Sequence, residues 1–76
     1  MLRHIFQGVD DIIWLNADET PVRERLEILE LNNLKSIVGN YRLMVIDEIQ
    51  RIKNAGLLLK LLVDNLKEVQ FVATGS

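Results

Sequence analysis

The stretch that decides the fold runs from residue 43 to residue 50 and reads LMVIDEIQ. Four apolar residues lead directly into two adjacent carboxylates, Asp47 and Glu48, after which the chain becomes polar. A short continuous apolar run predicts a strand that is buried on both faces. Because burying unpaired charge is costly, we expect the two acids to emerge at the carboxyl end of the strand, where open α/β sheets bind their ligands.

Two more apolar runs predict strands on either side of this one in the sequence, at residues 11–16 and 69–73. Residues 12–15 read IIWL, so we expect this strand also to be covered on both faces, with Trp14 in the core. Thr20 and Pro21 then suit the N-cap and first position of a helix. That helix has one apolar stripe, formed by Val22, Leu26 and Leu29.

The remaining segments read as helices and turns. Asn32-Asn33 is expected to break the first helix, and residues 34–38 to form a shorter one that ends at Gly39-Asn40. Residues 50–54 read as a loop or a first turn, and residues 56–66 as a helix whose wide leucine face implies packing on a sheet or on a partner chain. Residues 1–7 read as the last turns of a helix that stops at Gly8.

Strands that alternate with helices predict the α/β class with parallel strands and right-handed crossovers. The length of 76 residues allows one small domain, or a piece of a larger one. We therefore expect a three-stranded parallel sheet with helices.

Composition excludes several kinds of protein. The chain has no cysteine and a single histidine, His4, which excludes disulfides and thiolate or histidine metal clusters. A net charge of −2 gives no electrostatic support for nucleic-acid binding. No apolar run approaches the roughly 20 residues that a membrane helix needs, and the N-terminus lacks the apolar region of a signal peptide. A cytoplasmic location without membrane contact is expected.

The central stretch resembles the Walker B strand of P-loop ATPases. Residues 47–52, DEIQRI, resemble the D-E-(I/V)-Q-x-(I/V/P) segment of a prokaryotic AAA-type ATPase family. Residues 73–76, ATGS, resemble that family's sensor-1 position, and residues 12–19 resemble its second strand with an "NxD" turn. The resemblance covers most of the chain. It departs from the family in one respect: nowhere in the 76 residues is there a phosphate-binding G-x-x-x-x-G-K followed by Ser or Thr.

The resemblance implies ATP and Mg²⁺ as cofactors and a role for each polar residue at the strand ends. Asp47 would hold Mg²⁺, through water, and Glu48 would activate the attacking water. Thr74 or Ser76 would contact that water or the γ-phosphate, with Thr74 our choice for the catalytic set. The alternative is that the acids only solubilise a strand end and cap the next helix, and that the hydroxyls only stabilise a turn around Gly75.

Other polar residues have a functional and a structural interpretation. Asp18 and Glu19 could add to a metal site, but acids are common in turns and at helix starts. Arg51 could act as an arginine finger toward a neighbouring protomer, but a solvated loop arginine is the commoner case. Asn16 could line a site, and His4 is expected at the surface.

As a whole, the resemblance implies a single partial ATPase domain at residues 1–76, with a second strand, a Walker B strand at 43–48 and a sensor-1 strand at 69–74. Such a chain would be part of an ATP-hydrolysing ATPase and inactive alone. The 43–46 strand would lie between the other two, leaving 69–73 as an open edge through which we expect homo-oligomers. The alternative is a small oligomerising interaction domain, or a truncated product, without nucleotide chemistry.

Overall fold

The computed structural model describes residues 11–75. The helix expected at residues 1–7 with its stop at Gly8, and the positions of His4 and Ser76, lie outside this range. The elements in chain order are β1 (Ile12–Asn16), α1 (Thr20–Leu26), α2 (Leu31–Val38), β2 (Leu43–Asp47), a 3-10 turn (Ile49–Arg51), α3 (Ala55–Asn65) and β3 (Gln70–Ala73). None of the helices in this range is long and apolar enough to cross a membrane.

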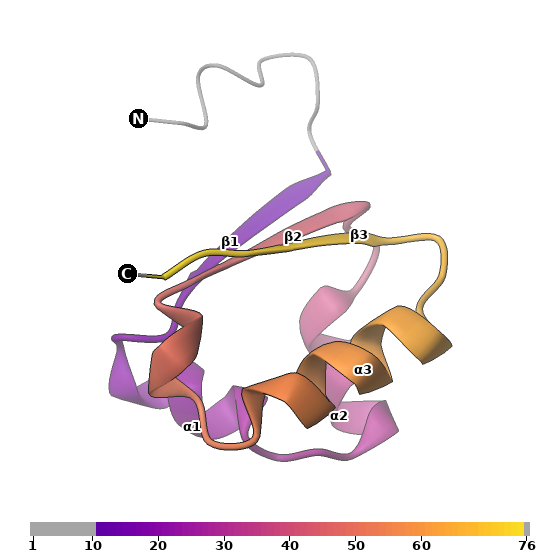
Figure 1. The fold of residues 1–76 in the computed structure, drawn as a ribbon. Helices are drawn as coiled ribbons and strands as arrows, with labels where there is room; N and C mark the ends of the chain where they lie inside the picture. Colours follow the sequence, from indigo (N-terminus) through magenta and orange to yellow (C-terminus); the bar gives the residue numbers. More distant parts are fainter. Residues whose placement is uncertain (1–10, 76) are drawn as a thin grey trace.

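The three strands form one parallel sheet in the order β1-β2-β3 (Figure 1). In the pairing register of the three strands, Met44 of β2 lies directly between Ile13 of β1 and Phe71 of β3. The α/β class, the parallel pairing and the central place of the 43–46 strand are therefore confirmed. The strands themselves start one residue later than expected for β1 and β3.

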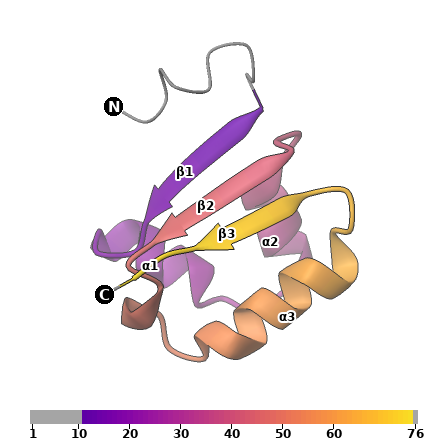
Figure 2. The ribbon, with the colours of Figure 1, turned by 45° about the horizontal axis from the view of Figure 1, so that its top comes forward.

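All three helices lie on the same face of the sheet (Figures 1 and 2). Both connections between strands run in the same direction across the sheet, and right-handed crossovers in one direction place their helices on one face. The expected burial of β2 on both faces is confirmed, since Met44, Val45 and Ile46 are all buried, whereas β1 is only half-buried along its length. On the face away from the helices, Val45 is buried, Trp14 is half-buried and Val72 is 44% exposed. Trp14 accordingly lies outside the main core cluster.

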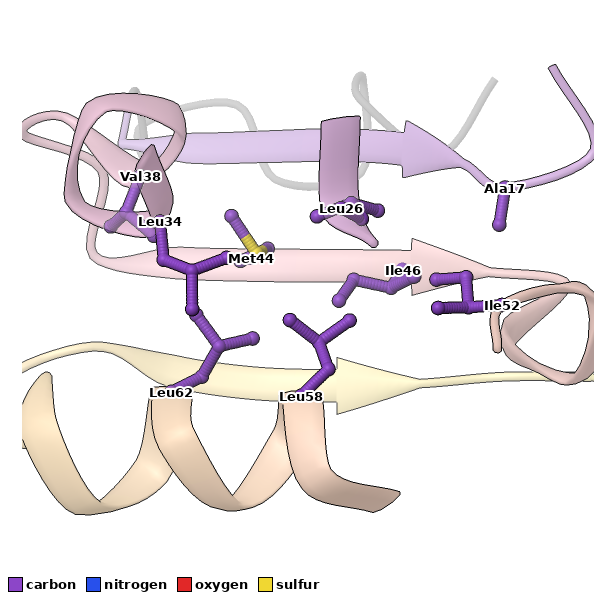
Figure 3. Packing of buried hydrophobic residues seen from close by; sticks show 9 residues of the cluster. All are labelled: Ala17, Leu26, Leu34, Val38, Met44, Ile46, Ile52, Leu58 and Leu62. Atoms are coloured by element: carbon purple, nitrogen blue, oxygen red, sulfur yellow. The ribbon is translucent and has the colours of Figure 1, made fainter. Parts of the chain in front are cut away.

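The core lies between the sheet and the helix layer. Met44 and Ile46 of β2 are fully buried, and Figure 3 shows Leu58 and Leu62 of α3 pointing toward them. Each such leucine contributes about 1.5–3 kcal/mol by leaving water. The buried cluster consists of Ala17, Leu26, Leu34, Val38, Met44, Ile46, Ile52, Leu58 and Leu62.

The break between the first two helices falls at residues 27–30, and not at Asn32-Asn33 as expected. Asn33 lies inside α2, where its side-chain amide donates to the carbonyl oxygens of Arg25 (2.8 Å) and Ile28 (3.0 Å). The same two carbonyls also accept backbone N–H groups, from Ile28 (3.3 Å) and Glu30 (2.9 Å). The side chain of Asn33 therefore adds two hydrogen bonds to the turn that follows α1.

The start of α1 also differs from expectation. Glu19, in extended conformation, is the N-cap, and no side chain forms a cap hydrogen bond. Thr20 is the first helical residue, and its hydroxyl accepts a hydrogen bond from Arg23 (3.3 Å). Pro21 is still tolerated, because the N–H groups of the first turn have no helical acceptor.

The wide apolar face of α3 is only partly used within residues 11–75. Leu58 and Leu62 are buried, whereas Leu57 and Val63 are 50% and 54% exposed. In the connection between β1 and β2, α2 stops at Gly39, as expected, with φ of 55° and ψ of −129°. Only glycine adopts this backbone conformation easily.

Candidate functional site

The carboxyl ends of all three strands meet at one edge of the sheet (Figure 2). Asp47, the last residue of β2, pairs with Asn16, the last residue of β1. On its other side, the amide N–H of Thr74 donates to the carbonyl oxygen of Ile46 (2.9 Å), which extends the β3 pairing by one residue. Asp47 therefore lies at the centre of the strand ends, between Asn16 and Thr74.

The carboxylate of Asp47 is held on one side only. Its Oδ1 accepts hydrogen bonds from the hydroxyl of Thr74 (2.6 Å) and from the backbone N–H of Glu48 (3.0 Å). Within residues 11–75, Oδ2 accepts no hydrogen bond from the protein. The side chain is thus oriented by two donors and keeps one anionic oxygen for a further partner.

Glu48 has a left-handed backbone, with φ of 56° and ψ of 46°. A non-glycine residue in this region stores about 1–3 kcal/mol of strain and is held there by its surroundings. Three hydrogen bonds hold this conformation. The N–H of Glu48 donates to Oδ1 of Asp47, and the carbonyl of Glu48 accepts from the N–H of Arg51 (3.0 Å). In addition, the N–H of Ile49 donates to the carbonyl of Thr74 (2.9 Å). This turn ends the alternation of side chains between the two faces of the strand, so that the consecutive acids Asp47 and Glu48 can both reach one site.

Gln50 links Glu48 to the end of β3. Its Nε2 donates to Oε1 of Glu48 (2.6 Å), while its Oε1 occupies the space that a Cβ at position 75 would need. Gly75 is therefore required for Gln50 to reach this position. Gln50 belongs to the DEIQ motif, although the sequence pattern assigns it no role. The one sequence feature that could have indicated this role is the short separation of Gln50 from Glu48, two residues earlier in the predicted turn.

Thr74 is fixed by three hydrogen bonds. Its N–H and carbonyl are bonded to Ile46 and Ile49, and its hydroxyl proton is donated to Asp47. Because a hydroxyl carries one proton, Thr74 in this state orients Asp47 and can only accept from a further group. The hydroxyl of Thr74 was expected to contact an attacking water or the γ-phosphate, whereas in the structure it contacts Asp47. Ser76, the other candidate hydroxyl, lies beyond the described residues.

The remaining candidates lie at the rim of the site. Arg51 pairs with Asp18 (Nε to Oδ1, 3.4 Å), and both side chains are 57% exposed, so the pair adds little stability. Glu19 is the N-cap of α1, and the Oδ1 of Asn16 accepts the N–H of Asp18 (2.9 Å). In the part of the chain that is described, no three histidine or acidic side chains gather around one point. A metal here would rest on Asp47 and on ligands from elsewhere.

The parallel sheet and the polar strand ends define an α/β architecture compatible with part of a P-loop NTPase fold. The family model described as an AAA domain matches residues 1–76, and the chain belongs to this family. Comparison with curated proteins and with solved structures found no match.

Proposed function

We propose that this chain contributes the magnesium-coordinating and water-activating acids of an AAA-type ATPase. Membership of the AAA domain family supports an ATPase-like function. The observation that carries the proposal is the shared hydrogen bonding of Asp47 Oδ1 by Thr74 and Glu48, because it orients one acid and leaves Oδ2 open. Mg²⁺ is commonly bound by one or two carboxylates together with water and substrate phosphates. A single oriented aspartate therefore fits this cofactor.

Each residue of the proposed site has its own role. Asp47 would hold the hydrated metal ion, and Thr74 keeps the carboxylate of Asp47 in place through its hydrogen bond to Oδ1. Glu48 accepts the proton of the attacking water. Gln50 orients the carboxylate of Glu48 through the 2.6 Å hydrogen bond from its Nε2 to Oε1. Mg·ATP, when bound, supplies the phosphoryl group and the charge that polarises it.

In this proposal, residues 1–76 form one partial ATPase domain that does not hydrolyse ATP alone. The backbone N–H groups and the lysine of a glycine-rich loop are the main ligands of the β- and γ-phosphates. The 76 residues contain no such loop, so we expect weak nucleotide binding and no hydrolysis unless another segment supplies it.

The test is an amide NMR titration of the full chain with Mg²⁺ and ATP. In the wild type, the signals of Asp47, Glu48 and Thr74 should shift on adding both together. Asp47→Asn keeps the Oδ1 acceptor and removes the charge, and should weaken the effect of Mg²⁺ about 10- to 100-fold, as loss of a water-mediated metal partner does.

Asp64→Asn is the matched control, since Asp64 is an exposed acid near the end of α3 and away from the strand ends. It should behave like the wild type. A well-dispersed spectrum that nucleotide leaves unchanged, or equal shifts in the wild type and Asp47→Asn, would contradict the proposed site.

A second candidate function is a small oligomerising interaction domain. It is favoured by the exposure of two apolar side chains, Val63 of α3 (54%) and Val72 of β3 (44%). It needs no nucleotide, and a nucleotide-inert but folded chain would support it.

A further inference from the structure

The end of β3 contacts both acids of the proposed site through two consecutive residues. The hydroxyl of Thr74 donates to Oδ1 of Asp47 (2.6 Å). The next residue, Gly75, lies against the side-chain amide of Gln50, whose Nε2 donates to Oε1 of Glu48 (2.6 Å). The two acids are thus each restrained by a contact that starts from the same short segment.

The contact at Gly75 leaves no room for a side chain. A Cβ at this position would overlap Oε1 of Gln50 and lie 3.2 Å from its Cδ, whereas Cγ2 of Ile49 is at an ordinary contact distance of 3.5 Å. The obstructing atoms are the far end of a long side chain, and the φ of Gly75 is not positive. A movement of Gly75 toward Gln50, or an added methyl group, therefore displaces the amide of Gln50 and not the backbone.

One peptide group connects the two contacts. It joins Thr74 to Gly75, and its carbonyl oxygen accepts the N–H of Ile49 (2.9 Å). The N–H of Thr74 donates to the carbonyl of Ile46 (2.9 Å), so this piece of backbone is held to the end of β2 as a unit. A shift of Thr74 consequently changes the position of Gly75 relative to Gln50.

We propose that the end of β3 couples the two acids. The contact of Thr74 with Asp47 sets how firmly Glu48 is held. The inference rests on the proposed function, in which Asp47 is the metal acid and Glu48 the base. When the carboxylate of Asp47 is drawn toward a cation, Thr74 follows it through the hydroxyl hydrogen bond. Gly75 then moves relative to Gln50, and the orientation of the base changes with the state of the metal acid.

Two independent contacts would give a different result. Within residues 11–75, no hydrogen bond joins the side chains of Thr74 and Gln50. If the contacts were independent, the hydroxyl of Thr74 could be removed without any effect on Gln50. The coupling instead requires that the effect of this hydroxyl reaches Gln50, and that it does so only while Gly75 lies against the amide.

The hold of Gln50 on Glu48 is measured from the side-chain amide of Gln50 by NMR, in the full chain without metal or nucleotide. A proton donated to a carboxylate resonates downfield, so the two Nε2 protons should be further apart in chemical shift than those of the exposed Gln70. Gly75→Ala should reduce this separation to that of Gln70. Gly56→Ala, which adds a Cβ that meets nothing within 4 Å, is the matched control and should leave it unchanged.

Thr74→Val tests the coupling, because it removes the hydroxyl and nearly keeps the shape of the side chain. It should change the separation of the Gln50 protons, whereas Thr74→Ser, which keeps the hydroxyl, should retain the wild-type value. In the Gly75→Ala background, Thr74→Val should have no further effect, since the contact that transmits it is already lost.

Equal Gln50 signals in the wild type and Thr74→Val would overturn the proposal. So would an unchanged separation in Gly75→Ala, or an effect of Thr74→Val that persists in the Gly75→Ala background. A dispersed amide spectrum shows that each variant is folded, and if Thr74→Val unfolds, Asp47→Asn weakens the same hydrogen bond and is compared in its place. Failure of the proposed function has a different signature, a chain that Mg²⁺ and ATP leave unchanged, and this experiment uses neither.

Discussion

At the scale of single residues, the site depends on an unfavourable backbone conformation. Glu48 is left-handed, and three local hydrogen bonds hold it there. Strain of this kind is concentrated at functional sites, where it serves the geometry of side chains. Here it turns Glu48 out of the strand while Asp47 stays in register with Asn16. The proposed chemistry therefore has a stability cost that a substitution can expose.

Glu48→Gly should increase the free energy of unfolding by about 1 kcal/mol, since glycine adopts positive φ freely, although its unfolded chain gains entropy. Urea denaturation measures this difference. Asn54→Gly is the matched control, because Asn54 has nearly the same backbone angles and asparagine tolerates them better. The increase in the free energy of unfolding should be smaller for Asn54→Gly than for Glu48→Gly. If Glu48→Gly were less stable than the wild type, the hydrogen bond of Gln50 to Glu48 would contribute more than the strain costs.

At the scale of helices and strands, two glycines occupy opposite situations. Gly39 ends α2 with a backbone that side chains disfavour, whereas Gly56 lies in the first turn of α3. An added Cβ meets nothing within 4 Å at either position. The two sites therefore isolate the backbone effect from packing.

Gly39→Ala should lower the free energy of unfolding by about 1–3 kcal/mol, because alanine is strained at φ of 55°. Gly56→Ala should raise it by about 0.5–1 kcal/mol, because alanine is the better helix former. Thermal or urea unfolding of both variants gives the comparison. Changes of the same sign would mean that packing, and not backbone conformation, decides the outcome.

The helix boundaries show where local sequence patterns stop being informative. Gly39 is a local stop signal, and the end of α2 was predicted correctly. The predicted break between α1 and α2 was misplaced, because Asn33 bonds to the carbonyls of Arg25 and Ile28, contacts that exist only after the chain turns back. A helix propensity scale treats Asn33 as a breaker, although here it belongs to the next helix.

At the scale of the whole molecule, the parallel sheet was predictable, because strands that alternate with helices leave few other connections. The strand order was predicted from the resemblance to P-loop ATPases. The meeting of Asp47 and Thr74 followed from the parallel pairing, because parallel strands end at one edge. The left-handed turn at Glu48 and the contact between Gln50 and Gly75 were not predictable, because they depend on how β2 and β3 lie side by side. The placement of α1, α2 and α3 on one face was also not predictable, because the apolar pattern of β2 indicates burial on both faces and does not say which segments cover them.

Residues 11–75 therefore form a sheet with helices on one face and polar side chains at the carboxyl ends of its strands. These strand ends are the basis of the proposed half-site.

The central claim is that Asp47 holds a divalent metal ion together with nucleotide. The most direct measurement replaces Mg²⁺ with Mn²⁺, which also prefers oxygen ligands in octahedral geometry, and follows paramagnetic broadening of amide signals with ATP present. The account predicts selective loss of the signals of Glu48, Thr74 and Gly75 in the wild type and in Asp64→Asn, and their persistence in Asp47→Asn. Broadening centred on other acids, such as Asp64 and Glu68, or broadening that Asp47→Asn leaves unchanged, would contradict it.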